Sequence, residues 1–231
     1  MRERIQAILL QIAEKAKAVG RAPASIRLLA VSKTHSTAKI REAYSLGLHQ
    51  FGENYADELT IKAAELRDLP DLRLVFIGQL QSNKIQSIVR NAHEIQSIAS
   101  EKHARYIERY ASEFGKSHFP VWIVVNAADE PSKQGVTLAS LPNLASFIND
   151  QCPHLTLMGI MAIPPASFSD AAWERSSDSS IPEVYKRLRL AANQTGEGKL
   201  SLGMSADLAL AIAAGSDCVR IGTAIFGTRN A

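Results

Sequence analysis

The stretch RLLAVSK (residues 27–33) is a short apolar run that ends in a serine and a lysine. Short runs rich in Val, Leu and Ile are typical of strands buried on both faces of a parallel sheet. Seven further runs of this kind follow, separated by longer amphipathic stretches, which is the pattern of repeated βα units. The sequence therefore predicts an α/β fold, a closed (β/α)8 barrel of the TIM type.

We expect the eight strands at residues 27–31, 49–51, 73–77, 94–97, 120–125, 155–160, 199–201 and 218–221. We expect helices between them at residues 37–46, 55–66, 83–90, 101–114, 138–151, 182–192 and 207–214. Ser36 and Ser205 precede two of these stretches and are expected to cap them. Residues 164–180 are rich in serine, proline and aspartate and are expected to form a long, mobile polar loop.

An extra helix is expected before the first strand. Ile5, Ile8, Leu9 and Ile12 have the i, i+3, i+4, i+7 spacing of an amphipathic helix, and Gly20 suits its end. The start lacks the apolar core of a signal peptide. A chain of 231 residues fits one barrel, so we expect residues 1–231 to form a single domain.

Composition excludes several classes of protein. Net charge is +3 with scattered Lys and Arg, which argues against a nucleic-acid partner. No run approaches the roughly 18 apolar residues of a membrane span. Cys152 and Cys218 form neither a CxxC pair nor a zinc-ligand pattern, so we expect no metal site and a reducing, cytoplasmic setting.

Lys33 directly follows the first strand, where barrel enzymes carry their reactive groups. A lysine amine titrates near pH 10.4 in water, but a desolvated one loses part of its charge and can attack an aldehyde at about neutral pH. The alternative is an ordinary solvated lysine at a strand end. This segment alone leaves both interpretations open.

Two segments near the end of the chain suggest a phosphate site. In SLGMSAD (residues 201–207), glycine breaks a strand before a helix start, and the Ser205 hydroxyl could bind an anion or only cap the helix. In VRIGTAIFG (residues 219–227), Arg220 interrupts an apolar strand and Gly222 permits close approach of a ligand. Barrels commonly bind phosphate at the loops after strands seven and eight, which are these loops.

An aldehyde at one end and a phosphate at the other describe pyridoxal 5'-phosphate (PLP), the commonest such cofactor. A barrel aldolase acting on a phosphorylated sugar needs the same two features. The chemistry of the residues therefore leaves both candidates open.

Seven ordered motifs resemble those of the YggS/PROSC family, the pyridoxal phosphate homeostasis proteins, over nearly the whole chain. They are AVSKTH (30–35), FGENY (51–55), FIGQLQSNK (76–84), VNAADEPSKQG (125–135), GIMAIP (159–164), LSLGMSADL (200–208) and VRIGTAIFG (219–227). The resemblance implies the fold of the N-terminal domain of alanine racemase.

The resemblance also implies roles for individual residues. Lys33 is expected to form the Schiff base with PLP, and Arg220 to face the pyridine nitrogen. Other positions are expected to contact the phosphate or lie near the ring: Ser205, Gly222 and Thr223 for the phosphate, and Asn54 and Met161 for the ring.

The resemblance implies a PLP carrier with a role in vitamin B6 and amino-acid homeostasis, and no catalytic residue is assigned. Racemases of similar fold use a second base from another domain, and we expect no such domain here, which favours the carrier. A low-activity amino-acid racemase or lyase is the alternative. A module that signals to protein partners is a third possibility, suggested only by the serine-rich loop. We expect a monomer whose PLP could pass to apo-enzymes.

Overall fold

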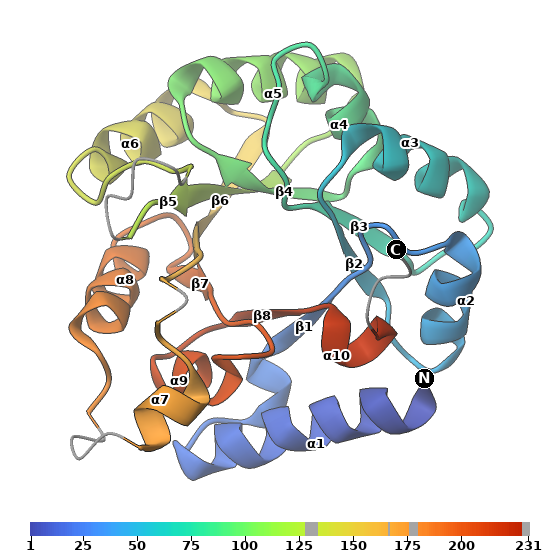
Figure 1. Cartoon of the computed structure of the whole chain (residues 1–231). Coiled ribbons are helices and arrows are strands. Elements are labelled where there is room, and N and C mark those ends of the chain that lie inside the picture. The colour runs from blue at the N-terminus through green and yellow to red at the C-terminus, as the bar shows by residue number, and fades with distance from the viewer. Residues whose placement is uncertain (128–133, 166, 176–179, 228–231) are drawn as a thin grey trace.

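The computed structural model describes residues 1–127, 134–165, 167–175 and 180–227. Within these ranges eight parallel strands close into one barrel in sequence order, and the first strand pairs with the last (Figure 1). The strands are β1 (Arg27–Val31), β2 (Gln50–Glu53), β3 (Arg73–Phe76), β4 (Glu94–Ile98), β5 (Phe119–Val125), β6 (Leu155–Ala162), β7 (Lys199–Ser201) and β8 (Cys218–Ile221). The expected fold class is confirmed.

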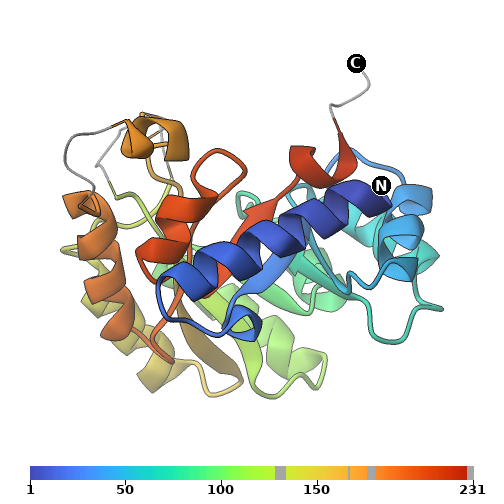
Figure 2. The same cartoon turned by 90° about the horizontal axis from the view of Figure 1, so that it is seen from below.

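Helices form an outer ring around the barrel (Figure 1). The bounds are α1 (Arg2–Ala18), α2 (Thr37–Ser45), α3 (Ala56–Glu65), α4 (Ile85–Asn91), α5 (Glu101–Glu113), α6 (Leu141–Gln151), α7 (Asp170–Glu174), α8 (Glu183–Asn193), α9 (Leu208–Ala213) and α10 (Thr223–Phe226), with a short 3-10 helix, η1 (Pro23–Ser25). The first helix lies along α9 and α10 (Figure 2). Its buried face is narrower than expected, because Ile5, Ile8 and Ile12 are buried but Leu9 is 44% exposed.

Two expectations about the polar connections are wrong. The expected loop at 164–180 contains α7, whose first turn is capped by Ser169 Oγ, 3.2 Å from the amide nitrogen of Ala172. The neighbouring Asp170 carboxylate accepts hydrogen bonds of 2.9 Å from Ala209 and Leu210 at the start of α9. A contact distant in sequence therefore orders this part of the segment; its residues 166 and 176–179 lie outside the described ranges.

The second correction concerns helix starts. Ser36 occupies the N-cap position of α2 as expected, although its side chain makes no capping hydrogen bond. Helix α9 starts later than expected, with Asp207 at its N-cap. Ser205 therefore does not cap α9, and its hydroxyl is left for another role.

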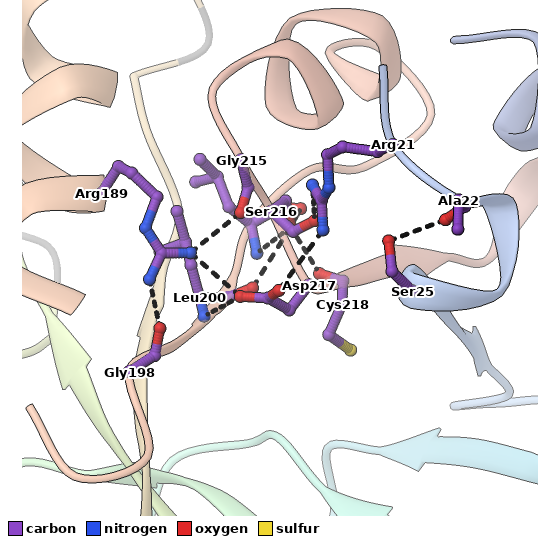
Figure 3. Close-up of polar contacts among 11 residues, drawn as sticks. Arg21, Ala22, Ser25, Arg189, Gly198, Leu200, Gly215, Ser216, Asp217 and Cys218 are labelled. Atoms are coloured by element: carbon purple, nitrogen blue, oxygen red, sulfur yellow. Dashed lines mark hydrogen bonds and ion pairs between the residues drawn. The ribbon is translucent and has the colours of Figure 1, made fainter. Parts of the chain in front are cut away.

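A polar cluster ties together the end of the barrel at which the strands begin (Figure 3). The carboxylate of Asp217, just before β8, lies between two guanidinium groups, 3.3 Å from Arg21 Nη2 and 2.9 Å from Arg189 Nη1. It also accepts a 2.9 Å hydrogen bond from the amide of Leu200 in β7. One carboxylate thus joins the chain after α1, helix α8 and two barrel strands.

Among the helices of the described residues, none combines the length and the apolar character that a bilayer-spanning segment requires.

Candidate functional site

A cavity of about 340 Å³ opens at the carboxyl ends of the barrel strands. Parallel strands all point the same way, so the loops that follow them meet at this end. The cavity is lined by all seven residues expected at the cofactor site: Lys33, Asn54, Met161, Ser205, Arg220, Gly222 and Thr223. Five other residues complete its wall: Val31, Ile77, Ile163, Met204 and Ala206. A second cavity of about 320 Å³ shares Asn54 and Met161 as part of its wall.

Lys33 sits in a tight turn directly after β1. The amide of His35 donates a 3.1 Å hydrogen bond to the carbonyl oxygen of Ser32, which closes the turn around Lys33 and Thr34. Thr34 has a φ of 64°, a value that side-chain-bearing residues rarely adopt. The turn reverses the chain at the edge of the cavity, so that the lysine side chain becomes part of the cavity wall.

Arg220 projects from β8 into the barrel and is 5% exposed. Nη1 donates to Ser201 Oγ at 2.8 Å, and Nη2 donates to the carbonyl oxygen of Ala162 at 2.7 Å. Burial lowers the pKa of the guanidinium, but arginine remains protonated in proteins because its ordinary value is so high. The cavity floor therefore carries a fixed positive charge.

Hydroxyl groups from two neighbouring loops form one corner of the cavity. Ser205 lies between β7 and α9, and Thr223 opens α10 directly after Gly222. The first turn of a helix leaves backbone N–H groups without partners inside the helix, and such groups bind anions. This corner can therefore bind a phosphate group.

The loop that carries Ser205 is held in place by Asp207. The carboxylate accepts a 2.7 Å hydrogen bond from the amide of Met204 and a 2.9 Å hydrogen bond from the hydroxyl of Tyr185 in α8. Asp207 and Tyr185 are buried, and burial raises the pKa of both side chains. Because the loop is tied to a buried side chain of α8, Ser205 has a defined position.

The site also contains a buried polar atom that lacks a partner. Asn54 Oδ1 has no hydrogen-bond partner among the described residues, and a bound molecule with a donor could supply one. An amine, a buried cation, two hydroxyls and this acceptor fit a small phosphorylated aldehyde with a polar ring.

The residues that hold these groups were not predicted from the sequence. Ser201 had no assigned role, although it accepts the hydrogen bond from Arg220, and a serine at the end of an apolar strand was its only signal. Tyr185 lies in an amphipathic helical stretch, and that pattern does not reveal its hydrogen bond to Asp207. The motifs contain two other lysines: Lys84 pairs with Asp57 at 2.7 Å, and Lys133 lies outside the described residues.

These features define a class of protein: a (β/α)8 barrel with a lysine after its first strand and an anion-binding corner after its last two. The model of the alanine racemase N-terminal domain matches residues 9–230. A pyridoxal phosphate homeostasis protein of Pseudomonas aeruginosa is 41% identical over 228 residues, covering 99% of this chain and 95% of the relative. The chain belongs to the alanine racemase N-terminal domain family and, within it, to the pyridoxal phosphate homeostasis proteins, as the sequence motifs indicate.

Several solved structures are also similar, and two of them illustrate the range. PipY of Synechococcus elongatus, solved with PLP bound, is 35% identical with a TM-score of 0.73, covering 94% of this chain and all of PipY. Alanine racemase of Streptomyces coelicolor is 16% identical with a TM-score of 0.71, covering 97% of this chain but 58% of the racemase. The second likeness is one of fold alone.

Proposed function

We propose that this chain binds PLP as a Schiff base on Lys33 and takes part in intracellular PLP (vitamin B6) and amino-acid homeostasis. The observation that carries the proposal is the shared cavity of Lys33, Arg220 and the hydroxyls of Ser205 and Thr223. The similarity to PipY with PLP bound and to homeostasis proteins supports the same cofactor.

When bound, PLP supplies an aldehyde carbon and an electron-withdrawing ring. Lys33 would supply the amine that condenses with this aldehyde, with the carbonyl oxygen released as water. Ser205, Thr223 and the backbone at Gly222 hold the phosphate, and Asn54 and Met161 border the ring.

Arg220 faces the pyridine nitrogen in this proposal. A cation there disfavours protonation of the ring nitrogen, because that would place a second positive charge beside it, and the unprotonated ring is a weaker electron sink. The site therefore favours holding the cofactor over carbanion chemistry, and we propose a carrier without catalytic turnover. An amino-acid racemase or lyase assay on the holo-protein tests this point, and clear turnover would contradict it.

The wider setting is part of the proposal. We propose one PLP-binding barrel domain over residues 1–231, a monomer in the cytoplasm, with PLP-dependent apo-enzymes as recipients. Both cysteines, Cys152 and Cys218, are buried free thiols, which supports a reducing compartment. Size-exclusion chromatography with light scattering tests the monomer, and transfer of PLP to an apo-enzyme is read out as its recovered activity.

The deciding experiment is borohydride reduction of the PLP-loaded protein followed by peptide mass spectrometry. We expect a visible absorbance band that borohydride bleaches and a phosphopyridoxyl adduct on the peptide containing Lys33. Lys33→Ala should remove both, whereas Lys84→Ala, which affects an exposed ion pair, should leave both intact. An adduct confined to another lysine would overturn the proposal.

A further inference from the structure

Three charged side chains form hydrogen bonds to the turn that carries Lys33. Glu53 ends β2, while Glu58 and Lys62 lie in α3, and together we call them the clamp. Lys62 Nζ lies 2.9 Å from both carboxylate oxygens of Glu53 and 2.9 Å from Glu58 Oε2. The cluster pairs two carboxylates with one ammonium group.

The clamp bonds to the residues on both sides of Lys33. Before it, Ser32 Oγ donates to Glu53 Oε1 at 2.5 Å, and the carbonyl oxygen of Ser32 accepts from Lys62 Nζ at 2.9 Å. After it, the amide of Thr34 donates to Glu58 Oε2 at 2.8 Å. Lys33 is thus the residue between two anchored neighbours.

The inner part of the clamp is buried. Ser32 and Glu53 are fully buried and Lys62 is 5% exposed. Buried charges are retained only when they are paired and hydrogen-bonded, and removal of one partner leaves an uncompensated charge. Burial raises the pKa of Glu53, while the charge of Lys62 acts in the opposite direction. The Nζ atom of Lys62 forms hydrogen bonds to Ser32 and to the two carboxylates. Because its amine is paired in this way, Lys62 does not compete with Lys33 for an aldehyde.

The clamp also holds a strained backbone. Thr34 is β-branched and has a φ of 64°, which is a strained backbone conformation for such a residue. Strain of this kind persists only where surrounding contacts over-determine the conformation. The Thr34 amide bond to Glu58 and the turn bond from His35 to Ser32 are those contacts here.

We propose that Glu53, Glu58 and Lys62 are positioning residues for Lys33, which aim its amine at the cavity and thereby set the rate at which it captures an aldehyde. The inference rests on the proposed Schiff base at Lys33. The alternative is an ion cluster that stabilises the fold and has no effect on the reactivity of Lys33.

The test compares capture of PLP by wild type, Glu58→Ala and Glu53→Gln. PLP is added at a fixed concentration, samples are reduced with borohydride at short intervals, and the adduct on the Lys33 peptide is quantified by mass spectrometry. Because misalignment of a reacting group by about 1 Å can slow a reaction by up to about 100-fold, we expect capture to slow about tenfold in both variants. Glu58 is 31% exposed in its side chain, so Glu58→Ala should fold even if Glu53→Gln does not.

The matched control is Asp217→Asn, which also removes one carboxylate from an ion cluster but at the opposite end of the barrel. It should lower the melting temperature. The rate of PLP capture should stay within about twofold of wild type, which corresponds to a change in activation free energy below about 0.4 kcal/mol. Thr34→Gly in the Glu58→Ala background should restore part of the rate, because glycine adopts a positive φ without strain.

Capture at the wild-type rate in folded Glu58→Ala and Glu53→Gln would overturn the positioning role. Equal slowing in Asp217→Asn would also overturn it, because the effect would then follow stability alone. If wild type itself gave no Lys33 adduct, the proposed Schiff base would fail first, and that result is recognisable without any variant.

Discussion

The guanidinium of Arg220 donates a hydrogen bond to the hydroxyl of Ser201 in the neighbouring strand, at 2.8 Å. Ser201 in turn donates to Gln96 Oε1 in β4 at 2.8 Å. Both partners of the arginine side chain, Ser201 and the carbonyl of Ala162, are neutral, and no carboxylate in the described ranges forms an ion pair with it. The positive charge is therefore oriented without being neutralised.

Arg220→Ala should weaken PLP retention about tenfold or more and alter the absorbance of the bound cofactor, because a buried polar site loses its cation. Ser201→Ala should have a smaller effect in the same direction, because Arg220 keeps its bond to Ala162. Equilibrium dialysis and visible spectra measure both. Unchanged affinity and spectrum in Arg220→Ala would place this side chain outside the cofactor site.

Gly203→Ala should distort the loop that carries Ser205. Gly203 has a φ of 101°, and an added Cβ would lie 2.5 Å from the Cβ of Ala211. We expect a loss of about 1–3 kcal/mol in the free energy of unfolding together with weaker PLP binding. Gly47→Ala is the control, since Gly47 has a φ of 94° with no atom within 4 Å of the added Cβ. Denaturant titration should show a loss of about 1 kcal/mol there, with PLP affinity unchanged.

Asp217→Asn should destabilise the end of the barrel shown in Figure 3. The substitution leaves Arg21 and Arg189, each about one-fifth exposed, without their shared carboxylate. We expect a loss of about 2 kcal/mol by urea unfolding. Asp68→Asn, which removes an exposed pair with Arg41, should change the same quantity by less than about 1 kcal/mol. Equal losses in both variants would contradict the assigned role of Asp217.

Cys152 should resist alkylation in the folded protein. Burial, with a further contribution from the charge of Glu108, raises the pKa of this thiol to about 11. The reactive thiolate is therefore scarce at about pH 8, and the rate of reaction with iodoacetamide should increase with pH up to the region of this pKa. A mass-spectrometric time course compares native and urea-unfolded protein. Rapid native labelling at pH 8 would show that the thiol is neither buried nor protonated as described.

The barrel could be predicted from sequence because its signals are local. Each strand is a short apolar run and each helix an amphipathic stretch, and β1, β7 and β8 have the bounds expected for them. Short polar elements were harder to predict. Helix α7 was missed because its Asp170 carboxylate is anchored by hydrogen bonds from the amides of residues about forty positions away.

The sequence by itself determined the chemical groups of the candidate site. Parallel strands end on one face, so Lys33, Ser205 and Arg220 had to share the mouth of any barrel built from these strands. Only the tertiary structure decided which charges are buried and what they hold: in the sequence, Lys62 is indistinguishable from a solvated helical lysine. Its bonds to Glu53 and Ser32 exist because β2 and α3 pack against the turn after β1, and burial of a charge depends on every neighbour that excludes water from it.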